Sequence, residues 1–322
     1  MKIGFHASHE QFPPEELLKL ASLAQQAGFD AAMCSDHFHP WSPSQGQSGF
    51  TWSWLGAAMQ ATQLPFGTMA IPGGWRYHPA IVAQAGATLS RMFPGRFLWL
   101  ALGSGEALNE RIVGQGWPEK AERNRRLKEA AEIIRALWAG ETVNRDGAIP
   151  VEDARLYTGP HDPPPLLYGA ALSPETAGWL GGWADGLLTV GAKTEQLRPI
   201  VDAFRRGGGE GKKLGLQVHV SWAASEEEAR EQAHTHWRFN VVPPGAAELL
   251  RTPEQFDAAT STVRPEDMED YVLMSPDPAF YVEALREFRS LGFEEIYVHN
   301  VGTNQREFVE AFGREVLPHL HE

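Results

Sequence analysis

Short apolar runs recur along the chain, and each is followed by a loop and a stretch with the spacing of an amphipathic helix. Most of these runs are continuously apolar, which is typical of strands buried on both faces. Only the seventh run alternates, with Gln217, His219 and Ser221 between apolar residues. We expect eight strands, at Lys2–Ala7, Ala31–Ser35, Phe66–Ile71, Phe97–Leu102, Leu166–Ala170, Gly186–Val190, Leu214–Trp222 and Glu295–Asn300.

Helix signals lie between the runs. Pro13-Pro14-Glu15-Glu16 opens an amphipathic stretch that Gly28 closes, and Ser173-Pro174-Glu175 and Ser225-Glu226-Glu227-Glu228 have the residues of helix starts. Eight strands that alternate with helices predict a (β/α)8 TIM barrel. A doubly wound sheet would instead favour a glycine-rich turn after the first strand, and residues 7–11 contain no glycine.

Two long connections interrupt the alternation, Glu141–Pro165 after the fourth helix and Phe239–Asp277 after the seventh. We expect them to be insertions that follow strands 4 and 7 of the barrel, because loops of this length are usually lids or extra binding walls. Nothing between residues 1 and 322 has the composition of a linker, so we expect one barrel domain over 1–322.

Composition narrows the class of protein. The formal net charge of −13 argues against nucleic acid or an anionic membrane as a partner, since both require clustered Lys and Arg. No apolar run reaches the roughly 18 residues of a spanning helix, and the N-terminus lacks the apolar core of a signal peptide, so we expect a cytoplasmic protein. Cys34 is the only cysteine, which excludes an internal disulfide and a multi-cysteine metal site.

Polar residues at the carboxyl ends of barrel strands are the candidates for function, because the loops there form the mouth of the barrel. The candidates of this kind are His6, Asp36, His37, Glu106, Asn109, Lys193, His219 and His299. Asp36 and His37 follow the second strand directly. A buried carboxylate beside an imidazole suits a general base or acid, although His37 could equally do no more than hydrogen-bond a loop at the end of its strand.

His37 and His39 also form an H-x-H pair, as in barrel metallohydrolases. Such enzymes need further ligands on later strands, but the fifth strand runs into Gly169-Ala170-Ala171 and the sixth into Val190-Gly191. We therefore expect no metal site.

Three further loops have unusual composition. Gly103-Ser104-Gly105 would allow a close approach of backbone to a ligand, and Glu106 and Asn109 would share a face of the short helix that follows, although a tight turn with a solvated Glu is an equal alternative. The turn Met69–Trp75 is crowded with Pro and Gly. The segment Leu167–Ser173 leads into a helix start where barrels often hold phosphate, and an empty helix cap is its alternative.

The segments Ser35–Trp41 and Gly103–Glu110 closely resemble motifs of the luciferase-like superfamily of flavin- and F420-dependent oxidoreductases, and most of all its F420-dependent glucose-6-phosphate dehydrogenase branch. The resemblance continues through Arg76–Ile81, Leu137–Glu141 and Ala184–Gly186, so it covers nearly the whole chain. It implies a luciferase-like barrel, a flavin-type cofactor, a small-molecule substrate and a homodimer.

The resemblance also implies roles for single residues. His37 would be the general base that takes a hydroxyl proton from the substrate, Glu106 would be an acid or electrostatic partner, and Trp41 would wall the substrate side. Lys193 matches a substrate-binding residue of the sugar-phosphate enzymes. Met69 and Ala70 match a bulge with a non-proline cis peptide behind the ring. The expected cofactor-binding residues are Asp36, His37, Met69, Ala70, Ser104, Gly105, Glu106, Asn109, Ala170, Ala171 and Leu172.

Two departures affect the substrate and the cofactor. The connection Phe239–Asp277 contains Pro265-Glu266-Asp267-Met268-Glu269-Asp270-Tyr271, where acidic groups would repel a phosphate, so we do not expect glucose 6-phosphate. Ala171-Leu172 stands where the family often has two glycines, and a similar subgroup is proposed to use FMN. F420 supports hydride transfer only, whereas reduced FMN can also activate oxygen, so FMN and F420 both remain open, as do dehydrogenase and monooxygenase.

Three functions thus follow from the sequence. The first is a flavin- or F420-dependent oxidoreductase with His37 as general base. The second is a metal-dependent hydrolase that uses His37 and His39, and the third is a non-catalytic barrel. The presence of Asp36, His37, Glu106 and Asn109 together favours the first, because a purely structural role does not require this set.

Overall fold

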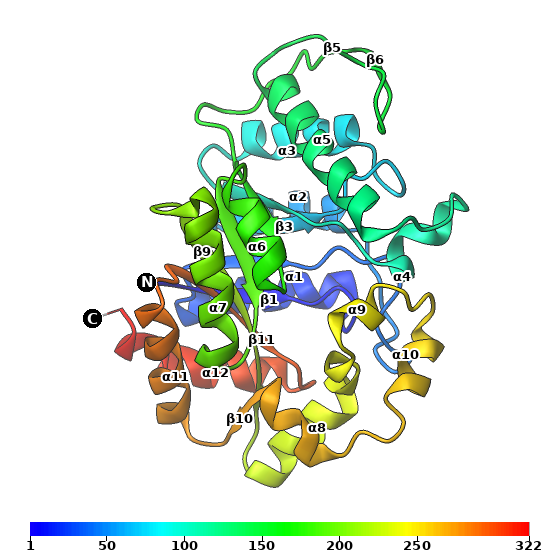
Figure 1. Ribbon diagram of the computed structural model, residues 1–322. Coiled ribbons are helices and arrows are strands. Elements are labelled where there is room, and N and C mark those ends of the chain that lie inside the picture. The colour runs from blue at the N-terminus through cyan, green and yellow to red at the C-terminus, as the bar shows by residue number, and fades with distance from the viewer. Residues whose placement is uncertain (322) are drawn as a thin grey trace.

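Eight parallel strands close into a barrel in the computed structural model, which describes residues 1–321 (Figure 1). Each strand pairs with the next in the order β1, β2, β3, β4, β7, β8, β9 and β11, and β11 pairs with β1 to close the circle. The predicted barrel is therefore confirmed. The strand bounds are β1 (Lys2–Ala7), β2 (Ala31–Cys34), β3 (Phe66–Ala70), β4 (Phe97–Leu102), β7 (Leu166–Ala170), β8 (Gly186–Val190), β9 (Lys213–Trp222) and β11 (Glu295–Asn300).

Helices surround the barrel, and their starts carry the predicted caps. The Ser173 hydroxyl accepts from the backbone N–H of Thr176, and the Ser225 hydroxyl accepts from that of Glu228. Gly28 ends the first helix with a left-handed φ of 95°, which favours glycine. The helices are α1 (Pro14–Ala27), α2 (Thr51–Ala61), α3 (Pro79–Met92), α5 (Lys120–Trp138), α6 (Pro174–Gly181), α7 (Thr194–Phe204), α8 (Glu226–Trp237), α11 (Pro278–Ser290) and α12 (Gln305–Glu315).

Three aromatic rings fill the barrel interior. Trp99, Tyr168 and Tyr297 are buried together, with the Trp99 and Tyr168 rings stacked at a centroid distance of 5.3 Å. The indole N–H of Trp99 donates to the Tyr297 hydroxyl at 3.0 Å, so its polar atom is satisfied. Glycine on a neighbouring strand makes the space, because a Cβ on Gly67 would lie 2.2 Å from the Trp99 ring. The interior is thus a packed core and not a channel.

Both predicted insertions contain regular structure. After α5 the chain forms an antiparallel hairpin of β5 (Val143–Arg145) and β6 (Val151–Ala154). After α8 it forms α9 (Pro244–Ala247) and α10 (Pro253–Ala259), and then β10 (Leu273–Ser275), which extends the sheet beside β9. Phe239, Phe256, Met268 and Val272 of this second segment, which we call the late insertion, form an apolar cluster with Trp237 of α8.

The prediction of a cis peptide bond near Met69 and Ala70 is wrong. Among residues 1–321 the cis bond is Asp162–Pro163. Met69 and Ala70 instead continue a regular parallel ladder opposite Ala101 and Leu102, and the register shift of β3 lies earlier, at Phe66–Gly67. The ladder hydrogen bonds of β3 therefore continue through the segment where the bulge was expected. Within the described residues, no helix is both long and apolar enough to cross a membrane.

Candidate active site

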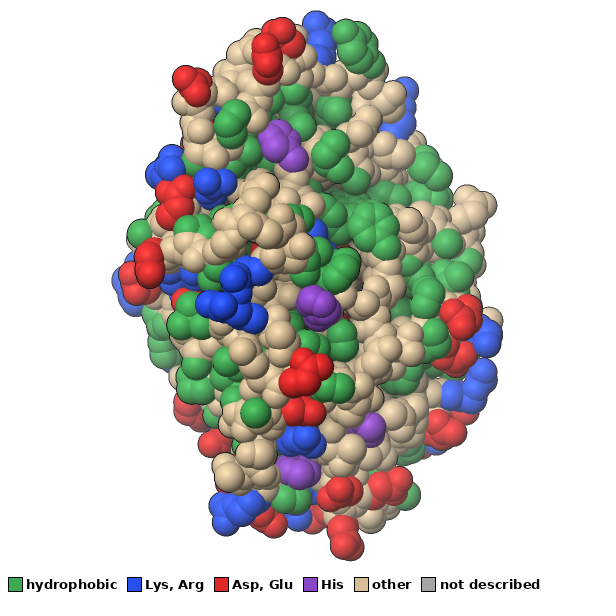
Figure 2. Space-filling view, turned by 90° about the vertical axis from the view of Figure 1, so that its right-hand side faces the viewer, with side chains coloured by type: hydrophobic (Ala, Val, Ile, Leu, Met, Phe, Trp, Pro, Cys, Tyr) green, Lys and Arg blue, Asp and Glu red, His purple; other side chains and the backbone are tan. Residues whose placement is uncertain are grey.

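The loops at the carboxyl ends of the strands meet on one side of the molecule. The short helix α4 (Ala107–Glu110), which follows β4, lies there beside α9 and α10 of the late insertion (Figure 1). Figure 2 views the molecule from this side, where histidine and hydrophobic side chains are exposed. His37, Glu106 and Asn109, which lie far apart in the sequence, come together here.

Asn109 holds the loop that carries His37. Its side-chain oxygen accepts from the backbone N–H groups of Phe38, at 2.8 Å, and His39, at 3.0 Å. Because these two donors fix the orientation of the amide, its NH2 group faces His37 Nδ1 at 3.0 Å and donates to it. The neutral imidazole therefore carries its proton on Nε2.

A carboxylate that the sequence analysis missed faces that nitrogen. Glu10 Oε1 lies 3.4 Å from His37 Nε2, and the side chain is buried. Its other oxygen accepts hydrogen bonds from the hydroxyls of Ser8, at 2.9 Å, and Ser35, at 2.6 Å. Burial by itself would raise the pKa of Glu10, but His37, the Ser35 hydroxyl and His6 together hold that pKa below its usual value.

Position relative to the strands could have identified Glu10. It lies three residues after the end of β1, in the turn whose lack of glycine argued against a doubly wound sheet. The same rule that selected Asp36 and Glu106, a polar residue just beyond a buried strand, applies to it equally.

Glu106 completes the polar cluster. Its Oε1 accepts from the Asn109 amide at 3.1 Å and lies 3.8 Å from His37 Nε2. The Glu106 side chain is 28% exposed, whereas that of Glu10 is 3% exposed, so Glu106 is the carboxylate open to the mouth. We call His37, Asn109, Glu10 and Glu106 the proton cluster.

Asp36 faces away from His37. The guanidinium of Arg76 donates to both of its carboxylate oxygens at 3.2 Å, and the Tyr77 hydroxyl donates to one of them at 3.1 Å. The carboxylate beside the imidazole is therefore Glu10 and not the sequence neighbour Asp36. Glu110 also accepts from Arg76, at 3.2 Å, and burial raises the pKa of Glu110 to about 7 against the opposing charge of Arg76.

Aromatic side chains wall the cluster on the side of the late insertion. Trp41 lies 4.8 Å from His37 between ring centroids, and it stacks on Phe239 at 5.7 Å. Phe256 contacts the edge of the Trp41 ring at 5.2 Å. Trp41, Phe239 and Phe256 thus form an aromatic cluster beside His37, and the insertion supplies two of its three rings; that Trp41 walls a substrate stays a prediction.

Three imidazoles lie in the barrel below the mouth. His299 is 4.4 Å from His6 and 5.3 Å from His219 between ring centroids, and Trp237 covers His219 at 4.9 Å. Burial lowers the pKa of His6 to about 4 and that of His219 to about 3, and it lowers the pKa of His299 as well. These side chains are therefore neutral at physiological pH.

Lys193 precedes α7 directly, and it is engaged by the late insertion. Its ammonium pairs with the Asp270 carboxylate, and Gln196 donates to the Asp270 carbonyl at 3.3 Å. The cation expected to bind substrate thus already has an anionic partner.

A shelf of small residues lies at neighbouring strand ends. Gly103 N–H donates to the Ala70 carbonyl at 3.1 Å, which joins the ends of β4 and β3, and Ala170 ends β7. The backbone N–H groups of Ser104, Gly105 and Glu106 donate to no acceptor within residues 1–321. Unpaired backbone donors of this kind are groups that the carbonyl oxygens of a flavin or deazaflavin ring would accept from.

The segment expected to hold the phosphate end of the cofactor lies at the start of α6, and this role stays a prediction. Ala171 and Leu172 lead into α6, whose cap is Ser173, and Leu172 is exposed.

Nδ1 of His39 contacts the Leu108 carbonyl at 2.8 Å, so His39 does not face His37 as a second metal ligand would. Among the described residues, no three His, Cys, Asp or Glu side chains form a group that could hold a metal ion.

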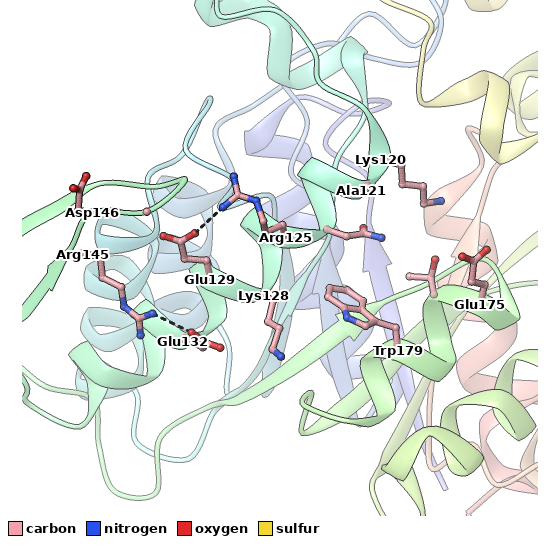
Figure 3. Close-up of a pocket in the computed structure, with 13 residues that line it drawn as sticks. Lys120, Ala121, Arg125, Lys128, Glu129, Glu132, Arg145, Asp146, Glu175 and Trp179 are labelled. Carbon is pink, nitrogen blue, oxygen red and sulfur yellow. Dashed lines mark hydrogen bonds and ion pairs between the residues drawn. The ribbon is translucent and has the colours of Figure 1, made fainter.

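A separate groove of about 920 Å³ runs between α5 and α6 (Figure 3). Four cations and four carboxylates line it, and two pairs of them are in contact, Arg145 with Glu132 at 3.1 Å and Arg125 with Glu129 at 3.9 Å. No residue of the proton cluster lines it. Its charge is balanced, and we assign no role to it.

Comparison with known proteins gives consistent relatives. The luciferase-like monooxygenase family matches residues 1–295 of the chain. The F420-dependent glucose-6-phosphate dehydrogenase of Microbacterium testaceum is 34% identical over 330 residues, which cover 99% of this chain and 97% of that protein. The enzyme of the same name from Nakamurella multipartita is also 34% identical, with 99% and 96% covered.

Solved structures agree with the sequence relatives. An F420-dependent secondary alcohol dehydrogenase in complex with an F420–acetone adduct superposes with a TM-score of 0.92 at 30% identity, and the match covers 100% of this chain and 99% of that one. The F420-dependent tetrahydromethanopterin reductase of Methanopyrus kandleri has a TM-score of 0.79 at 19% identity, with 99% of each chain covered, and it shares the fold.

Proposed function

The chain belongs to the luciferase-like monooxygenase family of oxidoreductases, and from that membership we propose that it is an F420-dependent dehydrogenase of a small uncharged alcohol. The observation that carries the proposal is the proton cluster, in which an imidazole lies between two carboxylates beside a shelf that suits a flat ring.

The choice of F420 over FMN rests on the relatives. The curated proteins at about one third identity over the full length are F420-dependent, as is the structural relative at 30% identity. Met69 and the shelf residues Ala70, Ser104 and Gly105 would support the ring, and Ala170, Ala171 and Leu172 would hold the phosphate end. F420 supplies hydride transfer when bound, and FMN, the alternative, would add oxygen activation.

The remaining chemistry belongs to the chain itself, because oxidation of an alcohol to a carbonyl releases a hydroxyl proton. We place the acceptor at His37, as the general base, together with Glu10. Asn109 leaves the proton of the neutral ring on Nε2, so His37 would first pass that proton to Glu10 at 3.4 Å and then accept the hydroxyl proton at the same nitrogen. Nε2 would next give its proton to Glu106, which lies 3.8 Å away and is open to solvent, and Glu10 would return its proton to the ring.

An uncharged substrate follows from the electrostatics of the mouth. Lys193 is paired with Asp270, the neighbouring side chains of the late insertion are acidic, and the buried imidazoles below are neutral. A phosphate would therefore meet the Asp270 carboxylate here, and Lys193 would be available to it only after this ion pair is broken. Trp41 and Phe239 instead offer an apolar wall to a short aliphatic chain.

Cofactor binding tests the proposal directly. Fluorescence titration of the purified protein should give micromolar or tighter binding of F420 and weaker binding of FMN. With F420, a small secondary alcohol should be oxidised at a kcat/KM at least tenfold above that of glucose 6-phosphate. Binding of FMN alone with consumption of oxygen would establish a monooxygenase instead, and binding of neither cofactor would refute both.

We also propose a homodimer, in line with the family resemblance. Phe50, just before α2, and Ile81, in α3, are 56% and 58% exposed, and a second copy of the chain would cover such side chains. Light scattering during gel filtration should give twice the mass of the chain. A mass equal to one chain at micromolar concentration would contradict the proposal.

A further inference from the structure

Arg76 joins three strand-end loops from within the protein. It comes from the loop after β3, and its side chain is 8% exposed. Nε donates to Glu110 Oε1 at 3.2 Å, and Nη1 and Nη2 donate to the two oxygens of Asp36, each at 3.2 Å. Nη2 also donates to the Asp36 backbone carbonyl at 3.0 Å. Arg76 thus contacts the loops that follow β2 and β4 at once.

The two carboxylates are sequence neighbours of the residues that define the proton cluster. Asp36 precedes His37, and Glu110 follows Asn109. The hydrogen bond to the Asp36 carbonyl holds the peptide unit that leads into His37. A displacement of Arg76 would therefore displace His37 and Asn109, because each is one peptide bond away from a carboxylate residue that Arg76 contacts.

The contacts need the shape of a guanidinium and not only its charge. Arg presents five N–H donors in a planar fork, whereas Lys presents three donors from one point. One ammonium has no geometry that reproduces the paired contacts with Asp36 together with the one to Glu110. The cluster also places two carboxylates against one cation, and Glu110 Oε2 has no partner within residues 1–321. A protonated Glu110 would still offer Oε1 to Nε.

We propose that Arg76 is a positioning residue of this site, whose fork sets the separation of the β2 and β4 loops and so maintains the Asn109–His37 hydrogen bond. Its effect on turnover rests on the proposed function, but its effect on His37 does not. Asn109 itself still bridges the two loops through Phe38 and His39, so the protein should fold without the fork.

Arg76→Lys tests the inference in two ways. With cofactor and alcohol, kcat should fall about 10- to 100-fold while the KM for the alcohol stays within about threefold, because misplacement of a reacting group by about 1 Å costs this much. In the protein without cofactor, 15N NMR of labelled histidine should show the His37 Nδ1 signal leaving its hydrogen-bonded, unprotonated position. The signal is assigned by its loss in His37→Gln.

Arg135→Lys is the matched control. Arg135 also donates to a carboxylate, Asp185 at 2.7 Å, and to a carbonyl, Trp183 at 2.9 Å, but it lies on α5 outside the cluster. This variant should change neither kcat nor the His37 signal. If Arg76→Lys leaves both unchanged too, or lowers only the melting temperature, Arg76 has a merely structural role and the inference is wrong.

A second pair of variants keeps the test decisive if Arg76→Lys is poorly folded. Glu110→Gln keeps an oxygen for Nε to donate to, whereas Glu110→Met removes it. The Gln variant should retain kcat within about threefold and keep the His37 Nδ1 signal at its hydrogen-bonded position. The Met variant should show the lower kcat and the displaced signal expected of Arg76→Lys. Equal behaviour of the two variants would overturn the inference. The NMR arm needs no cofactor, so a failure of the proposed dehydrogenase activity leaves it informative.

Discussion

Asn109 fixes the tautomer of the neutral His37 ring, because its amide cannot rotate without losing two backbone hydrogen bonds. It leaves one ring nitrogen, Nε2, for chemistry, and the two carboxylates flank that nitrogen. A single side chain from one loop thereby fixes the tautomer of a residue on another. The tautomer of His37 thus depends on hydrogen bonds between the loops after β2 and β4, which neither loop sequence shows by itself.

Replacement of His37 by Ala should lower kcat by about 10²- to 10⁴-fold, the range of general base catalysis, and leave the dissociation constant of the cofactor within about threefold. Stopped-flow reduction of the cofactor and fluorescence titration measure the two quantities. His39→Gln is the control, since its ring contacts the Leu108 carbonyl outside the proton cluster. Loss of less than about tenfold in His37→Ala would show that His37 is not the base.

Glu110 should make stability depend on pH. Its pKa is about 7 in the folded protein, above the usual 4.5, so the folded state holds a proton that the unfolded state releases between these values. The contribution to stability is therefore full below about pH 4.5 and is lost as the pH rises to about 7, with an upper bound of about 3 kcal/mol. Urea unfolding at pH 5 and pH 7.5 measures it.

In Glu110→Gln the part of this pH dependence of stability that Glu110 contributes should disappear, because the amide does not titrate. Other groups titrate over the same range, so the quantity to compare is the difference between variant and wild type at each pH. A constant difference across the range would show that Glu110 does not carry the pH dependence.

At the scale of elements, the late insertion sets the charge of the mouth. Asp270 pairs with Lys193, and the apolar cluster of the insertion supports Trp41 beside His37. One segment of the chain thus supplies both the apolar wall and the anionic partner of the cation at the start of α7. Substrate preference should therefore respond to changes in this segment without change to the barrel.

Asp270→Asn should free Lys193 and let an anion bind. We expect inorganic phosphate to inhibit the variant competitively with the alcohol, with an inhibition constant at least tenfold below that of the wild type. Initial rates at several phosphate concentrations measure it at constant ionic strength. Glu269→Gln removes a neighbouring charge that pairs with Arg230 instead, so it should leave inhibition as in the wild type. Equal inhibition in all three proteins would exclude Lys193 as an anion site.

The barrel strands and most helices could be predicted because each has a pattern of its own, an apolar run or a cap at fixed spacing. Other elements depended on contacts that no local pattern encodes. The β5–β6 hairpin and β10 consist of strands of three or four residues each, too short for a periodic signal. Glu10 and Arg76 have the polarity of surface residues, and only the closure of the barrel brings them to His37 and Asp36.

At the scale of the whole molecule, stability and chemistry occupy different levels of the barrel. The stacked Trp99 and Tyr168 and the neighbouring Tyr297 fill the interior, and the proton cluster lies beyond the carboxyl ends of the strands. Changes in the aromatic core should therefore alter unfolding without altering the site. This separation is the general arrangement of enzymes with this fold.

Gly67→Ala should destabilise the protein by about 1–3 kcal/mol, because the added Cβ would lie 2.2 Å from the buried Trp99 ring. Gly56→Ala is the matched control. Gly56 lies within α2, and an added Cβ there would meet no atom within 4 Å, so alanine should stabilise the helix by up to about 1 kcal/mol. Urea unfolding measures both variants, and equal stability of the two would contradict the tight fit around Trp99.

The filled interior also limits where small molecules can enter and leave the barrel. With Trp99, Tyr168 and Tyr297 buried across the barrel, molecules have no passage to the far end. In the proposed dehydrogenase, alcohol and ketone would therefore enter and leave at the same end, where the carboxyl ends of the strands lie. The ketone should accordingly compete with the alcohol for the same form of the enzyme, and release of the ketone should contribute to the rate of steady turnover.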